Sequence, residues 1–203
     1  MILPNPYHQE DSVTIYHGDC AAILPFLATF DLLLTDPPYG IGADVKHENC
    51  SSKHGWKSYG KTNWDDKRPA DWLILMALGK CENAIVWGGN YFSDLLPPTM
   101  GWLVWNKMQR EFSLADGELA WTSYQKALRI CDVSRGLALR DGKQHPTQKS
   151  VLVVEFCIDY SEKAGQKTIT TILDPFAGSG TTGLAAKNLN KKAVLIEKEE
   201  KYC

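Results

Sequence analysis

Short runs of aliphatic and β-branched residues recur along the chain and alternate with segments of helical character. The runs expected to be strands are Val13–Tyr16, Asp31–Thr35, Ala84–Trp87, Trp102–Trp105, Glu118–Trp121, Thr168–Leu173 and Ala193–Ile196. The segments expected to be helices are Ala21–Leu27, Asp71–Gly79, Ser150–Lys163 and Thr181–Leu189. Because helices between strands act as crossovers in parallel sheets, the alternation predicts an α/β domain with a mostly parallel central sheet.

The size and composition of the chain fit one globular domain, expected to span residues 1–203. Hydrophobic residues make up 44%, enough for a core, and charged residues make up 23%, which excludes a disordered polyelectrolyte. The longest apolar run, Trp72–Leu78, is far shorter than the roughly 20 residues of a transmembrane helix. Six cysteines without a C-x-x-C pair indicate reduced thiols, and the absence of Lys and Arg before Lys46 indicates no secretory signal peptide and a cytoplasmic protein.

Positive charge is concentrated in two segments, although the whole chain carries −2. Residues 1–45 carry −6, whereas residues 46–61 carry +3 and residues 121–149 carry +4. The overall balance excludes a uniformly basic nucleic-acid binder, so an anionic partner would have to meet a local patch. The positive segments overlap two stretches without a predicted element, residues 40–67 and 123–144. They are either such patches or solvated loops.

A glycine-rich turn at Gly178–Gly183 follows a predicted strand and begins a predicted helix, in the pattern G-x-G-x-x-G. Glu197 stands nineteen residues after Gly178, where a ribose-binding acid is expected. No Lys-Ser or Lys-Thr pair follows the glycines, which excludes a Walker loop. Asp174 would repel a pyrophosphate but attract an ammonium group, so the turn favours the cationic cofactor S-adenosylmethionine. An NAD-type oxidoreductase and a tight turn without a ligand are the alternatives.

Asp36-Pro37-Pro38-Tyr39 directly follows another predicted strand. In an open α/β sheet, ligands bind at the carboxyl ends of the strands, where this turn would lie. Its two prolines have a fixed φ and no N–H, so they form a stiff ledge with free carbonyls between a carboxylate and an aromatic ring. Such a ledge suits a flat ring that bears an amino group. A rigid surface turn is the alternative interpretation.

The chain resembles the DNA amino-methyltransferases in three motifs. Asp36–Tyr39, His145–Lys149 and Phe176–Gly180 match the Asp-Pro-Pro-Tyr, His-Pro-Thr-Gln-Lys-Pro and Phe-x-Gly-x-Gly motifs of that family. Their order, with the catalytic motif before the cofactor glycines, is similar to that of the permuted β group. The resemblance implies a Rossmann-like methyltransferase fold, dependent on S-adenosylmethionine and with a circularly permuted motif order. It also implies one catalytic domain, with short DNA-recognition insertions at residues 40–67 and 123–144.

Roles for individual residues follow from the resemblance together with the interpretations above. The expected catalytic group is Asp36, Pro37, Pro38 and Tyr39. The residues expected to bind S-adenosylmethionine are Asp19, His145, Thr147, Lys149, Asp174, Phe176, Gly178, Gly180, Thr181 and Glu197. Those expected to contact the phosphates of double-stranded DNA are Lys57, Lys61, Lys126, Arg129, Arg135 and Arg140. No metal is expected, because His47, Cys50 and His54 lack the spacing of a zinc site.

The resemblance implies direct transfer of a sulfonium methyl group to the exocyclic amino nitrogen of a base flipped out of the duplex. Asp36 and the Pro37 carbonyl would each accept one N–H, and Tyr39 would stack on the base. In the family that the chain resembles, an aspartate at the start of the motif is most associated with adenine, so the resemblance favours adenine, with the amino group of cytosine as an alternative. A cytosine carbon methyltransferase would need a Pro-Cys pair, which the sequence lacks. A DNA-binding module without turnover is the remaining alternative.

Overall fold

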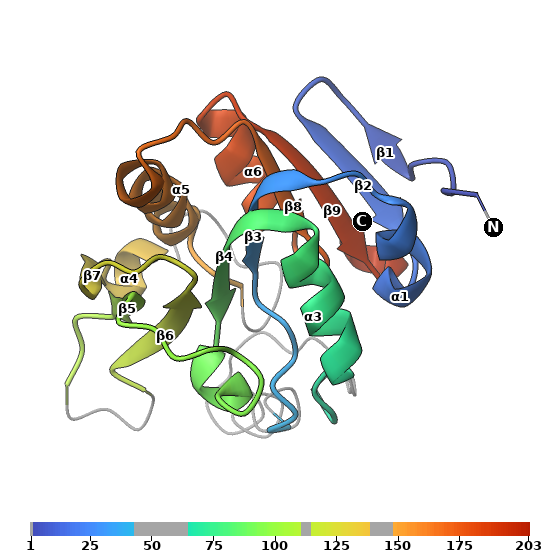
Figure 1. Cartoon of the computed structure of the whole chain (residues 1–203). Helices are drawn as coiled ribbons and strands as arrows, with labels where there is room; N and C mark the ends of the chain where they lie inside the picture. Colours follow the sequence, from blue (N-terminus) through green and yellow to red (C-terminus); the bar gives the residue numbers. More distant parts are fainter. Residues whose placement is uncertain (1, 43–64, 111–114, 139–147) are drawn as a thin grey trace.

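A mixed β-sheet forms the centre of the computed structural model, which describes residues 2–42, 65–110, 115–138 and 148–203 (Figure 1). Its strand order is β1-β2-β9-β8-β3-β4-β6-β5-β7. The strands are β1 His8–Gln9, β2 Val13–His17, β3 Phe30–Thr35, β4 Cys81–Trp87, β5 Trp102–Asn106, β6 Gly117–Thr122, β7 Arg129–Asp132, β8 Thr171–Asp174 and β9 Lys192–Glu197. Pairing is parallel from β2 through β9, β8 and β3 to β4, whereas β6 is antiparallel to both neighbours. The predicted α/β domain with a mostly parallel sheet is therefore confirmed.

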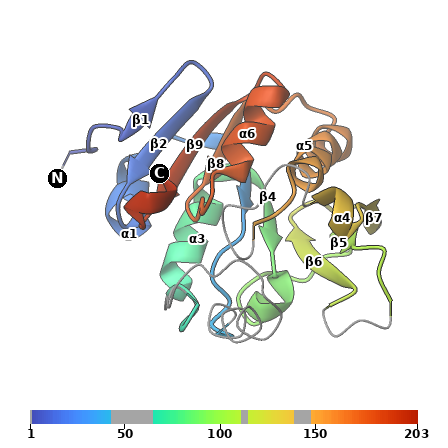
Figure 2. The same cartoon turned by 180° about the vertical axis from the view of Figure 1, so that it is seen from behind.

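Helices pack on both faces of this sheet (Figures 1 and 2). The α-helices are α1 Cys20–Ile23, α3 Asp71–Gly79, α4 Arg135–Ala138, α5 Val151–Gly165 and α6 Thr181–Asn188, and the 3₁₀ helices are η1 Leu24–Phe26, η2 Gly89–Phe92 and η3 Glu200–Tyr202. In β3, Leu32 and Leu34 pack in the core with α5 and α6, and Leu33 packs in the core with α1 and α3. A continuous apolar run of this kind is typical of a parallel strand buried on both faces.

Most predicted elements differ from the observed ones by one to three residues at their ends, and two of these differences have a clear physical cause. The segment expected as one helix at Ala21–Leu27 is divided into α1 and η1, since Pro25 has no N–H to continue an α-helical ladder. β8 begins at Thr171 and not at Thr168. The N–H groups of Thr170 and Thr171 both donate to the carboxylate of Asp31, at 2.9 Å each, so this side chain takes the place of strand partners there.

The stretch at residues 123–144 was expected to be irregular. The structure shows that it contains β7 and α4. β7 pairs in parallel with β5, with Cys131 opposite Trp105. Three of its four residues are exposed at the edge of the sheet, so the sequence has little of the apolar pattern that identifies a strand. Residues 139–144, and residues 43–64 of the other stretch expected to be irregular, lie outside the described residues.

Membrane-spanning helices, metal sites and free thiols were assessed in the described part of the chain. No helix there is long and apolar enough to span a membrane. No group of three or more His, Cys, Asp or Glu side chains in those ranges is placed to hold a metal ion, and the segment with His47, Cys50 and His54 lies outside them. The free thiols within them are Cys20, Cys81, Cys131, Cys157 and Cys203.

Candidate active site

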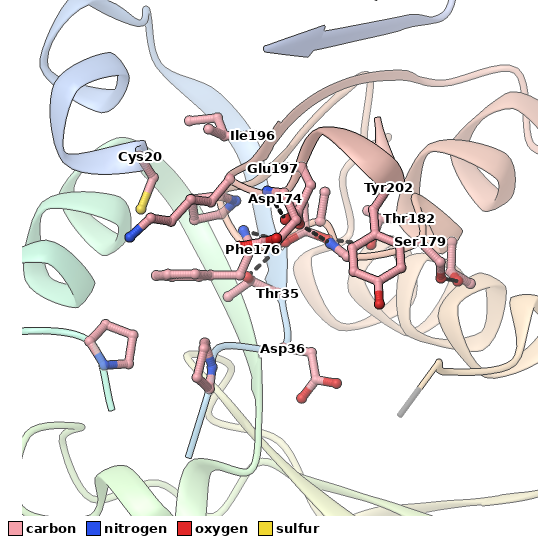
Figure 3. Close-up of a pocket in the computed structure, with 18 of the residues that line it drawn as sticks. Cys20, Thr35, Asp36, Asp174, Phe176, Ser179, Thr182, Ile196, Glu197 and Tyr202 are labelled. Atoms are coloured by element: carbon pink, nitrogen blue, oxygen red, sulfur yellow. Dashed lines mark hydrogen bonds between the residues drawn. The ribbon is translucent and has the colours of Figure 1, made fainter. Parts of the chain in front are cut away.

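The carboxyl ends of neighbouring parallel strands surround a cavity of about 430 Å³. Asp36 after β3, Asp174 at the end of β8 and Glu197 at the end of β9 all line this space (Figure 3). These acids come from distant parts of the sequence, and the adjacency of β3, β8 and β9 brings them together. The volume lies within the range of about 300–1,000 Å³ that is usual for ligand sites.

Asp174 is the most deeply buried acid of the cavity, with 3% of its surface exposed. Its carboxylate accepts hydrogen bonds from the hydroxyls of Thr35 at 2.8 Å and Thr182 at 2.6 Å, and from the N–H of Phe176 at 3.2 Å. Burial raises the pKa of Asp174 to about 6, and the nearby charge of Asp36 adds to the rise. A buried carboxylate without a cationic partner is costly, so this site favours the binding of a cation.

The glycine turn and Glu197 are joined by a hydrogen bond at a second polar region of the cavity. One Glu197 oxygen accepts the N–H of Gly178 at 2.7 Å, and the other accepts the N–H of Glu199 at 2.7 Å. Burial raises the pKa of Glu197. Gly178 and Gly180 have φ values of 52° and 74°, a backbone conformation that glycine adopts without strain. Gly178 and Thr181 line the cavity, whereas Gly180 contributes through the turn as the N-cap of α6.

Asp19 and apolar side chains complete the cavity beside β9. One Asp19 oxygen accepts the N–H of Ala21 at 2.9 Å and so caps α1, while the other lies 3.8 Å from the ammonium of Lys198. Phe176 and Ile196 line the same space. An exposed carboxylate next to apolar walls can bind a flat ring that carries hydrogen-bond donors.

The Asp36-Pro37-Pro38-Tyr39 turn borders the other side of the cavity, where Asp36 and Pro38 line it. The two Asp36 oxygens have different partners: the Tyr39 hydroxyl donates to Oδ1, and Lys149 Nζ lies 2.6 Å from Oδ2. Asp65 fixes the turn from outside, because its Oδ1 accepts the N–H groups of Tyr39 at 2.7 Å and Gly40 at 2.9 Å. The orientation of the Asp36 carboxylate is therefore set before any ligand binds.

Tyr39 is stacked on Tyr91, with ring centroids 4.8 Å apart and planes inclined by 17°. Gly88 makes room for the ring, since a Cβ atom at this position would lie 2.1 Å from Tyr39 Cε1. One face of Tyr39 is thus covered within the protein. A base could therefore stack on Tyr39, as predicted, only on the opposite face of the ring or after Tyr91 moves away.

Lys149, which the resemblance placed with the cofactor residues, lines the cavity but contacts two carboxylates. Its ammonium lies 2.6 Å from Asp36 and 2.8 Å from Glu118 on β6. Although burial favours the neutral amine, these two carboxylates raise the pKa of Lys149 well above its usual value. Sequence reasoning did not identify Glu118 as a site residue. Its only signal is a charged side chain in a short, otherwise mostly apolar strand.

The predicted DNA contacts are only partly within the described residues. Lys126 and Arg129 are exposed, and Arg129 donates to the carbonyl of Leu128 at 3.1 Å. Of Arg135, only the backbone at the start of α4 is described. The predicted site residues outside the described ranges are Lys57, Lys61, Arg140, His145 and Thr147. Contact between the basic residues and DNA phosphates stays a prediction.

The described lining of the cavity fits a cationic adenosine cofactor. Its charged side chains are the carboxylates of Asp19, Asp36, Asp174, Glu197 and Glu199 and the ammonium groups of Lys67, Lys149 and Lys198. The excess of carboxylates favours a ligand that carries sulfonium and ammonium groups. Asp174 is the strongest indication, because no lysine or arginine of the described ranges forms an ion pair with this buried acid.

Comparison with known proteins agrees with this geometry. The model of the N6/N4 DNA methylase family, described as DNA methylase, matches residues 104–203. The predicted resemblance to the DNA amino-methyltransferases is thus confirmed by a match to the N6/N4 DNA methylase family. The predicted cofactor, S-adenosylmethionine, is thereby confirmed, and the NAD-type oxidoreductase is wrong.

Two curated relatives cover the whole chain. The type II methyltransferase M2.DpnII of Streptococcus pneumoniae is 24% identical, and the match covers 91% of that protein. The type II methyltransferase M2.LlaDCHI of Lactococcus lactis subsp. cremoris is also 24% identical, with 90% of its length covered. DNA amino-methyltransferase activity that uses S-adenosylmethionine is therefore the class of reaction for this chain.

Solved structures support the same fold. The M1.HpyAVI–SAM complex has a TM-score of 0.58 at 22% identity and covers 94% of this chain and 95% of that one. PvuII DNA methyltransferase, named cytosine-N4-specific, has a TM-score of 0.61 at 17% identity and covers 100% of this chain and 87% of that one. The predicted Rossmann-like methyltransferase fold is confirmed, with the Asp-Pro-Pro-Tyr turn before the glycine turn in the chain.

Proposed function

We propose that the protein methylates the N6 amino group of adenine within a fixed sequence of double-stranded DNA. The observation that carries this proposal is the Asp36 carboxylate, which borders the cavity with both oxygens held, by Lys149 and Tyr39. A carboxylate oxygen has lone pairs for more than one donor, so each oxygen can still accept a further N–H. Asp36 is thus an oriented acceptor for an amino group at the edge of the cofactor site.

The roles of the other side chains follow from their positions. The bound cofactor supplies a methyl group on a positively charged sulfur. Asp174 would pair with the ammonium group of this cofactor, Glu197 would accept hydrogen bonds from its ribose hydroxyls, and Asp19 would accept one from its adenine. Asp36 accepts one N–H of the target base and so turns the nitrogen lone pair toward the cavity. The contribution of the protein is orientation and electrostatic stabilisation.

The choice of adenine depends on the residue that begins the Asp-Pro-Pro-Tyr turn. In the family that the sequence resembles, an aspartate at this place is the form most associated with adenine. The fold by itself does not decide, since a cytosine-N4-specific methyltransferase shares it. A fixed recognition sequence is supported by the type II methyltransferase names of the two curated relatives. The exposed Lys126 and Arg129 supply part of the positive surface that we propose for the DNA phosphates.

The product distinguishes the candidate substrates. Purified protein is incubated with genomic duplex DNA and S-adenosylmethionine that carries a labelled methyl group, and the DNA is digested for mass spectrometry. Labelled N6-methyladenine is the expected product. N4-methylcytosine would keep the mechanism and reject the substrate, and binding without any transfer would favour a module without turnover.

Replacement of Asp36 separates chemistry from cofactor binding. Asp36→Ala should lower kcat by roughly 100-fold or more, because it removes the oriented acceptor. The dissociation constant of the cofactor, measured by calorimetry, should change little. Asp116→Ala is a suitable control, since this exposed carboxylate lies 3.9 Å from Arg110 and does not line the cavity. Near-parental turnover by Asp36→Ala would remove this residue from the mechanism.

A further inference from the structure

Four charged side chains of alternating sign form a continuous series from the edge of the sheet to the cavity. Lys107 Nζ lies 2.5 Å from Glu118, Glu118 lies 2.8 Å from Lys149, and Lys149 lies 2.6 Å from Asp36. The four residues come from separate segments: the turn after β5, strand β6, the segment before α5 and the turn after β3. Asp36 is therefore connected to Glu118 through a single ammonium group.

Lys149 is the most deeply buried member of this series. The Lys149 side chain is 8% exposed, whereas that of Glu118 is 30% exposed. The ammonium of Lys149 also lies 5.2 Å from the centroid of the Trp87 ring. Two carboxylates and one aromatic face thus surround a buried ammonium, which is an arrangement that compensates for its lost hydration.

Loss of the Glu118 charge would leave Asp36 as the only carboxylate within ion-pair distance of Lys149 among the described residues. Asp36 would then be the sole carboxylate partner of this ammonium and would have more of its negative charge neutralised by it. An acceptor engaged in a tight ion pair is weaker toward a further N–H donor. The effect on methyl transfer would act through Asp36, since Glu118 does not line the cavity.

We propose that Glu118 is a positioning residue for methyl transfer, which shares the Lys149 ammonium and so keeps the Asp36 carboxylate oriented and available to the amino group of the target base. This proposal depends on the role of Asp36 in the proposed function. Lys107 pairs with Glu118 Oε1, the oxygen that does not contact Lys149, and its ammonium lies 4.9 Å from the centroid of the Trp105 ring. These contacts fix the Glu118 side chain at the end of the series away from the cavity.

The test compares Glu118→Gln with a matched variant. Glutamine keeps the shape of the side chain and removes its charge, so kcat for methyl transfer to duplex DNA should fall roughly 10-fold, as expected for a misplaced reacting group. KM for DNA and the calorimetric dissociation constant of S-adenosylmethionine should stay within about twofold. Glu162→Gln is the control, because Glu162 pairs with Lys191 at 2.5 Å, is 31% exposed and lies away from the cavity. It should leave kcat unchanged.

A merely structural role predicts a different pattern, namely a lower melting temperature in both glutamine variants and the same kcat as the parent. Glu118→Asp keeps the charge but shortens the side chain, and its kcat should lie between those of the parent and Glu118→Gln. If Glu118→Gln does not fold, Glu118→Asp decides alone, and parental turnover by it would overturn the proposal. So would parental kcat, or a loss of cofactor affinity without a loss of kcat, in Glu118→Gln. A parent protein that methylates no amino group would instead reject the proposed function.

Discussion

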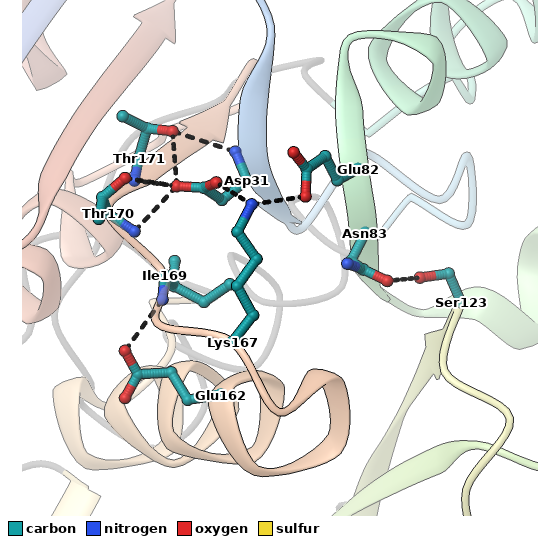
Figure 4. A network of polar contacts seen from close by, with 9 residues as sticks. All are labelled: Asp31, Glu82, Asn83, Ser123, Glu162, Lys167, Ile169, Thr170 and Thr171. Carbon is teal, nitrogen blue, oxygen red and sulfur yellow. Dashed lines mark hydrogen bonds and ion pairs between the residues drawn. The ribbon is translucent and has the colours of Figure 1, made fainter.

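Two aspartates at opposite ends of the same pair of strands are held in opposite ways. Asp31, near the start of β3, accepts the N–H and hydroxyl groups of both Thr170 and Thr171 and pairs with Lys167 at 2.9 Å (Figure 4). Asp174, at the end of β8, has two hydroxyls and one N–H as partners. Although burial favours its neutral form, hydrogen bonds from Thr170 and Lys167 lower the pKa of Asp31, whereas burial raises that of Asp174.

The difference corresponds to the two ends of a parallel sheet. At the amino ends, the acid is saturated with donors and joins β3 to the start of β8. At the carboxyl ends, the acid has no positively charged partner among the described residues, so a cationic ligand can provide the missing positive charge. The first arrangement stabilises the fold, and the second lowers stability at the place where we propose that the ammonium group of the cofactor binds.

The largest expected effect on stability is that of Asp31→Ala. The substitution leaves the N–H groups of Thr170 and Thr171 without their acceptor and should lower the free energy of unfolding by about 3 kcal/mol. Because the folded-state pKa of Asp31 is lowered, its stabilisation is present above the unfolded-state pKa and is lost as the pH falls through the folded-state value. Urea denaturation at pH 7.5 measures the change. Asp132→Ala, which removes one exposed acceptor of Asn106, is the control and should cost much less.

Asp174→Asn is expected to change the free energy of unfolding in the opposite direction. At pH 8 the parent carries a buried negative charge, and its removal should raise the free energy of unfolding by roughly 2 kcal/mol. The same variant should bind S-adenosylmethionine more weakly, because the ammonium group loses the partner that we propose for it. Urea denaturation and calorimetry give the two values. Loss of stability in this variant would mean that the hydroxyl contacts of Thr35 and Thr182 outweigh the burial of the charge, and the contrast with Asp31 would fail.

The pH dependence of stability should show the same contrast with a smaller change. Since the folded-state pKa of Asp174 is raised to about 6, the folded state binds more protons than the unfolded state below this pH. The parent should therefore lose about 1 kcal/mol between pH 5 and pH 7 relative to Asp174→Asn. Parallel stability profiles of the two proteins over this range would show that Asp174 titrates at an ordinary pKa.

The features of the fold and site that depend on residues close together in the chain could be predicted from the sequence. The apolar run Leu32–Leu34 predicted a buried parallel strand, and the acids that follow such strands predicted the three carboxylates of the cavity, Asp36, Asp174 and Glu197. Strand ends converge at one edge of a parallel sheet, so residues next to them meet without further information. The glycine turn with Asp174, together with the three family motifs, then predicted the cofactor.

The features that the sequence did not predict depend on contacts between distant residues. Lys149 and Asp36 are 113 residues apart, and no local pattern indicates that their side chains meet. Glu118 has the same difficulty, because its partner Lys149 is identified only by the three-dimensional arrangement. β7 was missed for another reason, namely that an edge strand with exposed side chains lacks the alternation on which the prediction depends.

The strand order also has a consequence for synthesis of the protein. β2 and β3 are consecutive strands in the chain but are separated in the sheet by β9 and β8, as in the pairings of Val13 with Ala193 and Leu32 with Ile172. A nascent chain on the ribosome therefore carries β2 and β3 each with an open edge until β8 and β9 emerge. Contacts of such long sequence separation slow folding, and open edges can pair with other chains in the meantime. A chaperone that covers these open edges should therefore increase the yield of folded protein.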